Sequence, residues 1–325
     1  MFERMGRIVV VVSLVFVATT AHAQSKTPVE TRNAALRYWL AFADIQDPPA
    51  DKAIADLLEK TAAGEATWDE AKLGPILDKN ETAIWRMQRA TKLPECDWGL
   101  EYDLGPRGSI AYAPRARVLA RLNTLDGMRL AAKGDTQKAV DTWLAGIRFS
   151  QHLSKGGSLI FSLIAKMGLV SNLHALAQAA QNSTLSDAQR RQVERAVRVL
   201  PETGFDWGQA LWYDQDPLDV AVKQMAEATS PAAYYQEMMG RAAPEKFTIP
   251  NAAEIAEYHK LMNSVKAALR LPPDAASERL KTLQDSAKRL HPFFRDAMPS
   301  FGRINDARLE VQVAREKLLQ AVSVK

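Results

Sequence analysis

The sequence predicts an all-α protein, and three observations lead to that fold class. Apolar residues recur at helical spacing through most of the chain. No stretch shows the sustained alternation of β-branched and polar residues that is typical of a strand. Proline, glycine and aspartate interrupt the apolar pattern at intervals that suit separate helices. We therefore expect an α–α superhelix with additional C-terminal helices and almost no sheet.

The first helices are bounded by clear stop signals. Residues 29–45 carry alanine and aromatic residues at helical spacing, and two prolines at positions 48–49 end that pattern. Residues 51–63 form a short amphipathic pattern. Further helix is expected over 68–93, and Gly74-Pro75 is expected to begin a new helical segment within it.

The rest of the chain also consists of helical patterns separated by stop signals. Residues 115–181 are predicted to be helical, with turns at Gly134-Asp135 and at 155–158. Ser186-Asp187 is expected to cap the next helix, which ends near residue 200. Later helices are predicted at 217–228, 231–241, 251–271, 274–290 and 303–322, with proline at most of the breaks between them.

The first 23 residues have the form of a bacterial export signal. Arg4 and Arg7 give a positive start, residues 8–18 are an apolar stretch, and Ala21-His22-Ala23 offers a cleavage site. The apolar stretch is much shorter than the about 20 residues that span a bilayer. We expect cleavage after Ala23 and a periplasmic or secreted mature protein without a stable membrane span. An uncleaved membrane anchor is the alternative.

Charge and length limit the partners and the domain organisation that we expect for the mature protein. The formal charge of the whole chain is +4, and removal of Glu3, Arg4 and Arg7 with the signal leaves +3. Basic and acidic residues are interleaved without a block of one sign, which gives nucleic-acid binding no support. The remaining length suits N-terminal helices with a loop (24–114), a helical core (115–200) and a C-terminal helical region (201–325). We expect these to form one continuous body.

Cys96 is the only cysteine, so no disulfide closes within the chain. We expect a buried, unreactive thiol, and an intermolecular disulfide is the alternative. A nucleophilic Cys or Ser would need a histidine nearby. The histidines of the mature chain, which stand in no recognised catalytic pattern, are His152, His174, His259 and His291.

Metal and cofactor binding also find little support. The chain lacks His-Glu-x-x-His and paired cysteines. Asp97, Glu101 and Asp103 could hold Ca²⁺, but the alternating oxygen ligands of a helix–loop–helix site are missing, and Arg107 and Arg115 are available to neutralise these carboxylates. No glycine-rich phosphate loop follows a strand. We expect no cofactor.

Residues 94–114 differ from their surroundings because proline and glycine are dense there. Together with Trp98 and Tyr102, this composition predicts an ordered loop that packs onto the protein. Segments 93–99 and 200–208 share the order Leu-Pro-Glu followed by Asp-Trp-Gly. A duplicated helical module would explain the similarity. We favour two independent uses of one device, in which proline ends a helix, aspartate caps the next and tryptophan fills the corner.

Residues 121–151 resemble a tetratricopeptide repeat. Gly134-Asp135 forms the turn between its two helices, and the small, large and aromatic positions of the motif are filled by Gly127, Leu130, Ala139, Trp143 and Gly146. Small residues let two antiparallel helices approach closely, while the aromatic ring fills the seam. The chain departs from the motif at Asn123, Asp126 and Gln151, and only this one repeat is convincing.

The longer segment from Cys96-Asp97-Trp98 to Leu176 is similar to a group of uncharacterised exported bacterial helical proteins. That resemblance implies a helical architecture and no particular chemistry. Because one helical pair cannot bury its apolar face alone, neighbouring helices must stack on it, and residues 158–181 are the first candidate.

These observations lead to three hypotheses about function. The first is an exported helical scaffold that binds an envelope protein or peptide without catalysis, and the repeat resemblance places Arg121, Thr124 and Met128 on its binding face. The second is a binder of a small apolar ligand or lipid. The third is a hydrolase centred on the 94–114 loop, with Asp97 and Asp206 as paired carboxylates if both loops meet in one cleft. Candidate contact residues in the first loop are Asp97, Trp98, Tyr102 and Arg107.

Overall fold

The all-α prediction is confirmed by the computed structural model, which describes residues 31–47, 51–101, 104–105 and 112–323, the side chains of 212–216 excepted. The predicted export signal lies outside the described residues. Within them the structure has one isolated β-bridge, between Asn33 and Glu95, and no strand. The described residues from Arg32 onward belong to one compact unit.

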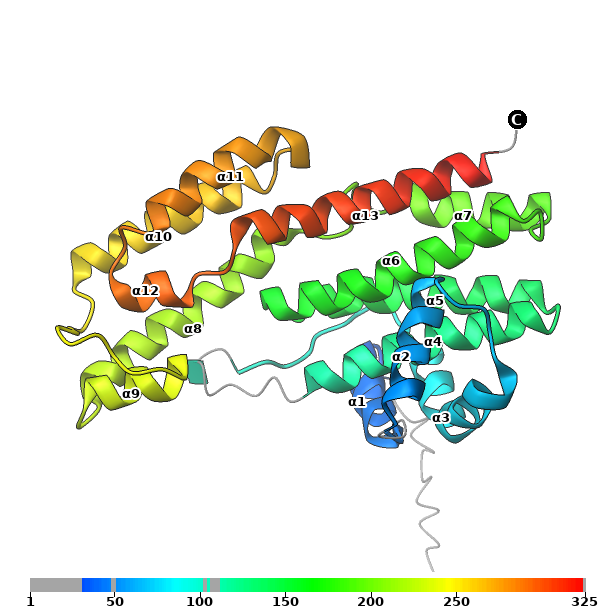
Figure 1. Cartoon of the computed structure of the whole chain (residues 1–325), viewed down its shortest axis with the longest axis horizontal. Coiled ribbons are helices and arrows are strands. Elements are labelled where there is room, and N and C mark those ends of the chain that lie inside the picture. Colours follow the sequence, from blue (N-terminus) through cyan, green and yellow to red (C-terminus); the bar gives the residue numbers. More distant parts are fainter. Residues whose placement is uncertain (1–30, 48–50, 102–103, 106–111, 324–325) are drawn as a thin grey trace, which may run out of the picture. The chain divides into compact units, whose positions relative to one another are not determined.

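Figure 1 shows the order of the helices along the chain. They are α1 (Ala34–Asp44), α2 (Lys52–Ala63), α3 (Glu70–Ala90), α4 (Tyr112–Ala132), α5 (Thr136–Ser154), α6 (Leu159–Gln181), α7 (Asp187–Arg198), α8 (Trp207–Glu227), α9 (Pro231–Met239), α10 (Ala252–Ala268), α11 (Pro273–Ala287), α12 (Pro292–Ala297) and α13 (Phe301–Val322).

Several helix ends lie where the capping residues predict. The Asp51 carboxylate accepts a hydrogen bond from the Ala53 backbone amide at 2.7 Å and starts α2. Ser186 and Gln189 form a reciprocal capping box at the start of α7. Gly134, with φ of +82°, adopts the left-handed conformation in the turn between α4 and α5.

Two predicted boundaries are wrong, and one helix was missed. Helix α3 continues through Pro75, because Asp69 caps it earlier and the apolar face around Leu73 is buried. Helix α8 begins at Trp207 rather than near residue 217, because Asp206 caps it and Pro217 is held inside the helix. In both helices proline removes only its own backbone hydrogen bond, and tertiary packing maintains the rest. The short helix α12 was not expected.

The α4–α5 pair is packed closely at its glycines. A Cβ atom built on Gly127 of α4 would lie 2.3 Å from Trp143 Nε1 of α5, and one on Gly146 of α5 would lie 2.6 Å from Asn123 Nδ2 of α4. The Trp143 indole donates a hydrogen bond to the Thr124 carbonyl at 3.1 Å. Gly127 therefore leaves the space that the tryptophan ring occupies, and Gly146 lets α4 approach α5 closely, as the sequence predicts.

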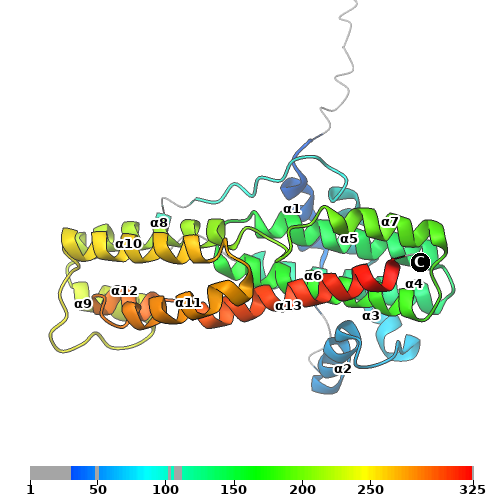
Figure 2. The ribbon, with the colours of Figure 1, turned by 90° about the horizontal axis from the view of Figure 1, so that it is seen from above.

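Helix α6 is the centre of the packing. It contacts α4 and α5 on one side and α13 on another, as Figures 1 and 2 show. Among the described helices it is the only one that is long and apolar enough to cross a membrane, and most of its apolar segment is buried against these neighbours. A salt bridge between Lys166 and Glu310 links it to α13. Its composition is explained by burial on several sides.

Candidate functional site

A groove runs between α4 and α6, and α2 closes one side of it. We call it the α4–α6 groove. Its volume is about 770 Å³. The residues that line it are Glu59, Ala113, Pro114, Arg117, Val118, Arg121, Ile160, Leu163, Ile164 and Met167.

The floor of the groove is an apolar stripe on α6. Ile160 is 43% exposed, Leu163 36% and Met167 41%. Their spacing places them on one face of the helix, over about two turns. Helix α6 packs against α5 and α13, whereas these three side chains remain at least one third exposed. A contiguous apolar surface of this kind is typical of an interaction site.

Two arginines form the polar wall of the groove, and both come from α4. Arg121 pairs with Glu59 of α2 at 2.6 Å, and Arg117 reaches the same carboxylate oxygen at 3.3 Å. A second hollow of about 450 Å³, lined in part by Thr124, Gly168 and the same three charged residues, adjoins the groove. The single Glu59 carboxylate neutralises only one of the two arginine charges, so the polar wall of the groove carries a net positive charge.

The predicted binding residues of α4 are placed differently from one another. Arg121 lines the groove. Thr124 has no solvent-exposed surface, its hydroxyl donates to the Ala120 carbonyl at 3.1 Å, and it does not line the α4–α6 groove. Met128 is half-buried and packs against the hydrophobic core. The α4 face that the sequence suggested is therefore mostly covered, and α6 supplies the exposed apolar contacts instead.

The described part of the 94–114 loop forms an aromatic corner. Trp98 is buried, stacks on Tyr112 with ring centroids 4.9 Å apart, and donates from Nε1 to the His152 carbonyl at 2.9 Å. Asp97 is exposed, and its carboxylate accepts a hydrogen bond from the Gly99 amide at 3.0 Å. These contacts hold the loop against α5 and α4. Tyr102 and Arg107 lie outside the described residues.

The environment of Cys96 is unsuited to nucleophilic catalysis. Burial raises the pKa of its thiol to about 12. The nearest histidine, His152, presents its backbone carbonyl to the Cys96 sulfur at 3.9 Å. Burial also lowers the pKa of the His152 imidazole to about 4, and its Nδ1 lies 2.7 Å from the Tyr38 hydroxyl, which occupies it in a hydrogen bond. The thiol is therefore protonated near neutral pH.

The two Asp-Trp-Gly segments occupy separate corners. Asp206 and Trp207 border a hollow of about 320 Å³ between the start of α8 and the end of α10, and no described residue of the 94–114 loop lines it. The Asp206 carboxylate caps α8 by accepting from the Gln209 amide at 3.0 Å. Asp97 and Asp206 each bind backbone amides locally, so the described residues offer no paired-carboxylate cleft.

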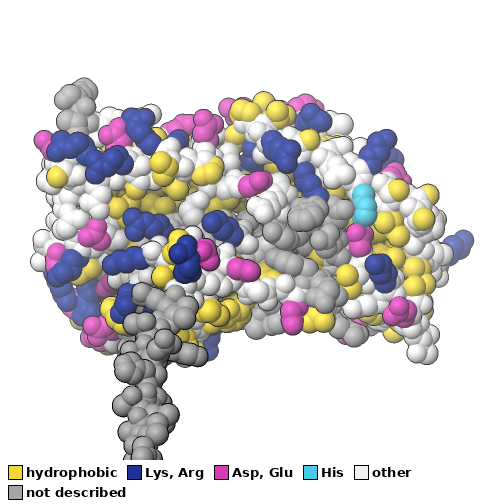
Figure 3. Space-filling view, turned by 180° about the vertical axis from the view of Figure 1, so that it is seen from behind, with side chains coloured by type: hydrophobic (Ala, Val, Ile, Leu, Met, Phe, Trp, Pro, Cys, Tyr) yellow, Lys and Arg dark blue, Asp and Glu magenta, His cyan; other side chains and the backbone are white. Residues whose placement is uncertain are grey.

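Among the described residues, neither groups of metal-ligating side chains nor the distribution of surface charge indicates another candidate site. In the described part of the chain, no group of three or more histidine, cysteine, aspartate or glutamate side chains is placed to hold a metal ion. The face shown in Figure 3 carries basic and acidic side chains interspersed with apolar ones. The α4–α6 groove is therefore the strongest candidate site for contact with a protein partner.

Comparison with known proteins identifies no relative. No protein-family model matches the chain, and no curated protein or solved structure is significantly similar to it. The likeness of residues 121–151 to a tetratricopeptide repeat accordingly stays a prediction.

Proposed function

We propose that this protein is an exported helical scaffold, and that it binds a protein partner by receiving an amphipathic, acidic helix in the α4–α6 groove. The observation that carries the proposal is the uncovered stripe of Ile160, Leu163 and Met167 beside two arginines.

The shape of the groove supports a helical occupant. Its α4 wall extends from Ala113 to Arg121, and its α6 floor from Ile160 to Met167. At 1.5 Å per residue both run for roughly 10–12 Å along their helices. A partner helix presents apolar residues at positions i, i+3, i+4 and i+7, which cover the same length. Such a helix therefore matches the stripe in length and in the spacing of its apolar residues.

The charge of the wall supports an acidic partner. Arg117 and Arg121 share the single Glu59 carboxylate, so a glutamate or aspartate on the partner can pair with one of them. The pairs are partly exposed, and charge complementarity at such a rim contributes mainly to association rate and specificity. The apolar stripe is expected to supply most of the affinity.

A peptide titration tests the proposal. The probes are two synthetic amphipathic helices with the same leucine stripe, one with glutamate and one with lysine on the flanking positions. We expect the acidic helix to bind at least about tenfold more tightly, and Leu163→Glu to weaken its binding by at least the same factor. Val199, an 81% exposed apolar residue beyond the end of α7, provides the matched control Val199→Glu, which should leave binding unchanged.

Two outcomes of that titration contradict the proposal. Equal affinity for the acidic and basic helices would show that Arg117 and Arg121 do not select an acidic partner. An unchanged affinity in Leu163→Glu would show that the peptide does not bind in the groove. In exporting cells, a photo-crosslinking residue at position 163, compared with one at position 199, then identifies the natural partner.

The same groove supports a second candidate function, the binding of a small apolar or lipid-like ligand with an anionic head. Its volume of about 770 Å³ lies in the range of small-molecule sites. Native mass spectrometry of the purified protein distinguishes the two, because a bound small molecule adds a defined mass that Leu163→Glu removes.

A further inference from the structure

A second hollow, which we call the α3–α5 cleft, lies between α3, α4 and α5. Its volume is about 660 Å³. The lining residues used below are Trp85, Gln88, Asp126, Asp141, Thr142 and Arg148. We propose that this cleft is a binding site for an uncharged saccharide, with a sugar ring stacked on Trp85 and its hydroxyl groups bound by the polar floor.

Trp85 supplies an apolar platform at the mouth of the cleft. It is 52% exposed, although tryptophan is a large side chain that proteins usually bury. The Arg89 guanidinium, which does not line the cleft, lies over its ring, 4.8 Å from the centroid, and restrains its orientation. The C–H face of a pyranose ring is flat and apolar, while its edge carries hydroxyl groups. An oriented indole beside polar groups suits that combination of surfaces.

The floor of the cleft is polar and preorganised. Gln88 Nε2 lies 3.2 Å from an Asp126 carboxylate oxygen, 3.3 Å from Asn123 Oδ1 and 3.5 Å from Thr142 Oγ1. Asn123 in turn donates to the Thr142 carbonyl at 2.9 Å. These contacts fix the side chains in place before any ligand arrives, which lowers the entropic cost of binding.

Unused hydrogen-bonding groups remain in the cleft. Within the described residues, Gln88 Oε1 and the second Asp126 oxygen accept no hydrogen bond, and Arg148 has no ion-pair partner. Two acceptors and one donor beside an aromatic platform match the alternating donors and acceptors of vicinal hydroxyl groups.

The charge balance of the cleft argues for an uncharged ligand. Its cationic side chains are Lys92, Arg129, Lys138 and Arg148, and its anionic side chains are Asp78, Glu81, Asp126 and Asp141. Four charges of each sign cancel.

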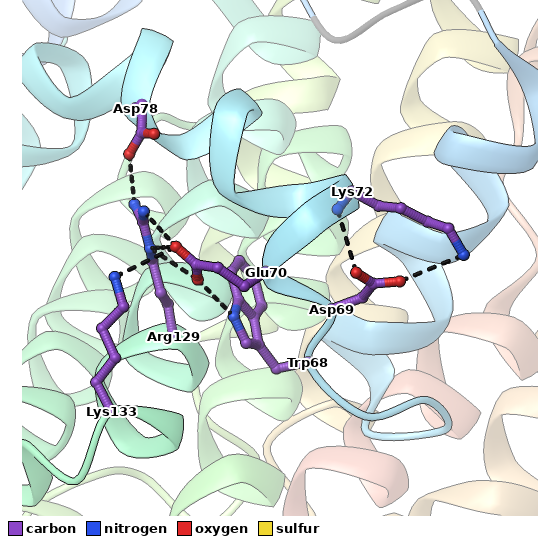
Figure 4. A network of polar contacts seen from close by, with 7 residues as sticks. All are labelled: Trp68, Asp69, Glu70, Lys72, Asp78, Arg129 and Lys133. Atoms are coloured by element: carbon purple, nitrogen blue, oxygen red, sulfur yellow. Dashed lines mark hydrogen bonds and ion pairs between the residues drawn. The ribbon is translucent and has the colours of Figure 1, made fainter.

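Several of these charges are already paired within the protein. Arg129 binds Glu70 and Asp78, each at 2.6 Å, in the network that joins α3 to α4 (Figure 4). Lys138 binds Asp135 at 2.6 Å. A polyanion or a polycation would therefore gain little here.

Isothermal titration calorimetry of the whole protein tests the proposal. The probes are neutral linear oligosaccharides of glucose and of N-acetylglucosamine, with adenosine as an uncharged flat comparator. We expect at least one oligosaccharide to bind with a millimolar or lower Kd, and Trp85→Leu to weaken that binding at least about tenfold. Asp126→Asn, which replaces one floor acceptor, should weaken it severalfold.

Trp39 of α1 is 41% exposed and lies outside the cleft, so Trp39→Leu is the matched control and should retain the affinity. Leu163→Glu should retain it too, which separates this proposal from the α4–α6 groove. Far-UV circular dichroism and the thermal midpoint verify that each variant is folded. Absence of oligosaccharide binding up to about 10 mM, tighter binding of adenosine than of any sugar, or unchanged binding in Trp85→Leu would overturn the proposal.

Discussion

At the residue scale, burial decides the chemistry of the groups that the sequence marks as reactive. Cys96 is half-buried beside the aromatic corner, and its thiol has a pKa of about 12. His152 is half-buried at the end of α5 with its ring bound to Tyr38. The sequence predicted an unreactive thiol at Cys96, and the placement of this residue agrees with that interpretation.

The first prediction concerns the reactivity of Cys96. Because the thiolate is the reacting species, a pKa near 12 makes it scarce at pH 8. We expect the native protein to react with a disulfide reagent such as DTNB at least about a hundredfold more slowly than the protein unfolded in guanidinium. Equal rates in the two states would show that the thiol is accessible and ionised.

The second prediction concerns the effect of His152 on stability. Its folded pKa of about 4 lies below the value of about 6.5 expected in the unfolded chain. The unfolded state therefore binds the proton more readily, so the stability that the neutral ring provides is complete above pH 6.5 and is lost as the pH falls toward 4.

Denaturant unfolding at a series of pH values measures this effect. Between pH 7 and pH 4 the wild type should lose on the order of 2 kcal/mol more than His152→Gln, which keeps a polar group for Tyr38 but does not titrate. Other titrating groups are common to both proteins and cancel in the comparison. Parallel pH profiles would show that the imidazole does not contribute.

At the element scale, close approach between helices depends on single glycines. The third prediction uses two helical glycines in different surroundings. A methyl group at Gly127 would overlap the Trp143 ring, whereas one at Gly302 would have only the Ser300 hydroxyl nearby, at 3.9 Å. Gly127→Ala should lower the free energy of unfolding by about 2 kcal/mol through overpacking.

Gly302→Ala should leave stability unchanged or raise it by less than about 1 kcal/mol, because alanine restricts the unfolded chain and favours helix. Chemical denaturation of both variants provides the comparison. A neutral Gly127→Ala would mean that α4 and α5 can separate without cost, contrary to the packing described above.

At the scale of the whole molecule, helices far apart in the chain pack on one another and bury each other's apolar side chains. Helix α13 covers α6, and its Val311 side chain lies against the left-handed Gly204 in the turn before α8. The fourth prediction compares two valines of α13. Val311 is fully buried, while Val313 is more than half exposed.

Val311→Asp should destabilise the protein by about 4 kcal/mol or more, because a carboxylate would be buried without a partner, and Val313→Asp should change stability by less than about 1 kcal/mol. Hydrogen exchange should show faster opening of α5 as well as α13 in Val311→Asp, since both belong to one compact unit. Faster exchange confined to α13 would indicate that the C-terminal helices unfold independently.

Most helix ends and turns could be predicted from the sequence. The caps at Asp51 and Ser186 and the turn at Gly134 follow from side-chain chemistry within a few residues, so neighbouring sequence suffices to predict them. The prolines at 75 and 217 misled the prediction, since the packing that keeps α3 and α8 continuous involves distant segments.

The binding surfaces required the tertiary structure. Arg121 was expected at a binding face and lines the groove, but Thr124 of the same predicted face is buried. No feature of the sequence distinguishes Leu163 from the buried leucines of α6, because that helix is apolar on all sides. The side of α6 that stays exposed depends on where α2 and α13 pack. Trp85 and Asp126 line one cleft because of the way α3 packs against α4.

The sequence by itself therefore determined the fold class, most helix boundaries and the close α4–α5 pair, since these depend on interactions between residues near in the chain. The tertiary structure alone decided which apolar side chains stay exposed and which polar groups share a cleft. Those outcomes depend on contacts between helices separated by long stretches of chain, and local periodicity carries no information about them.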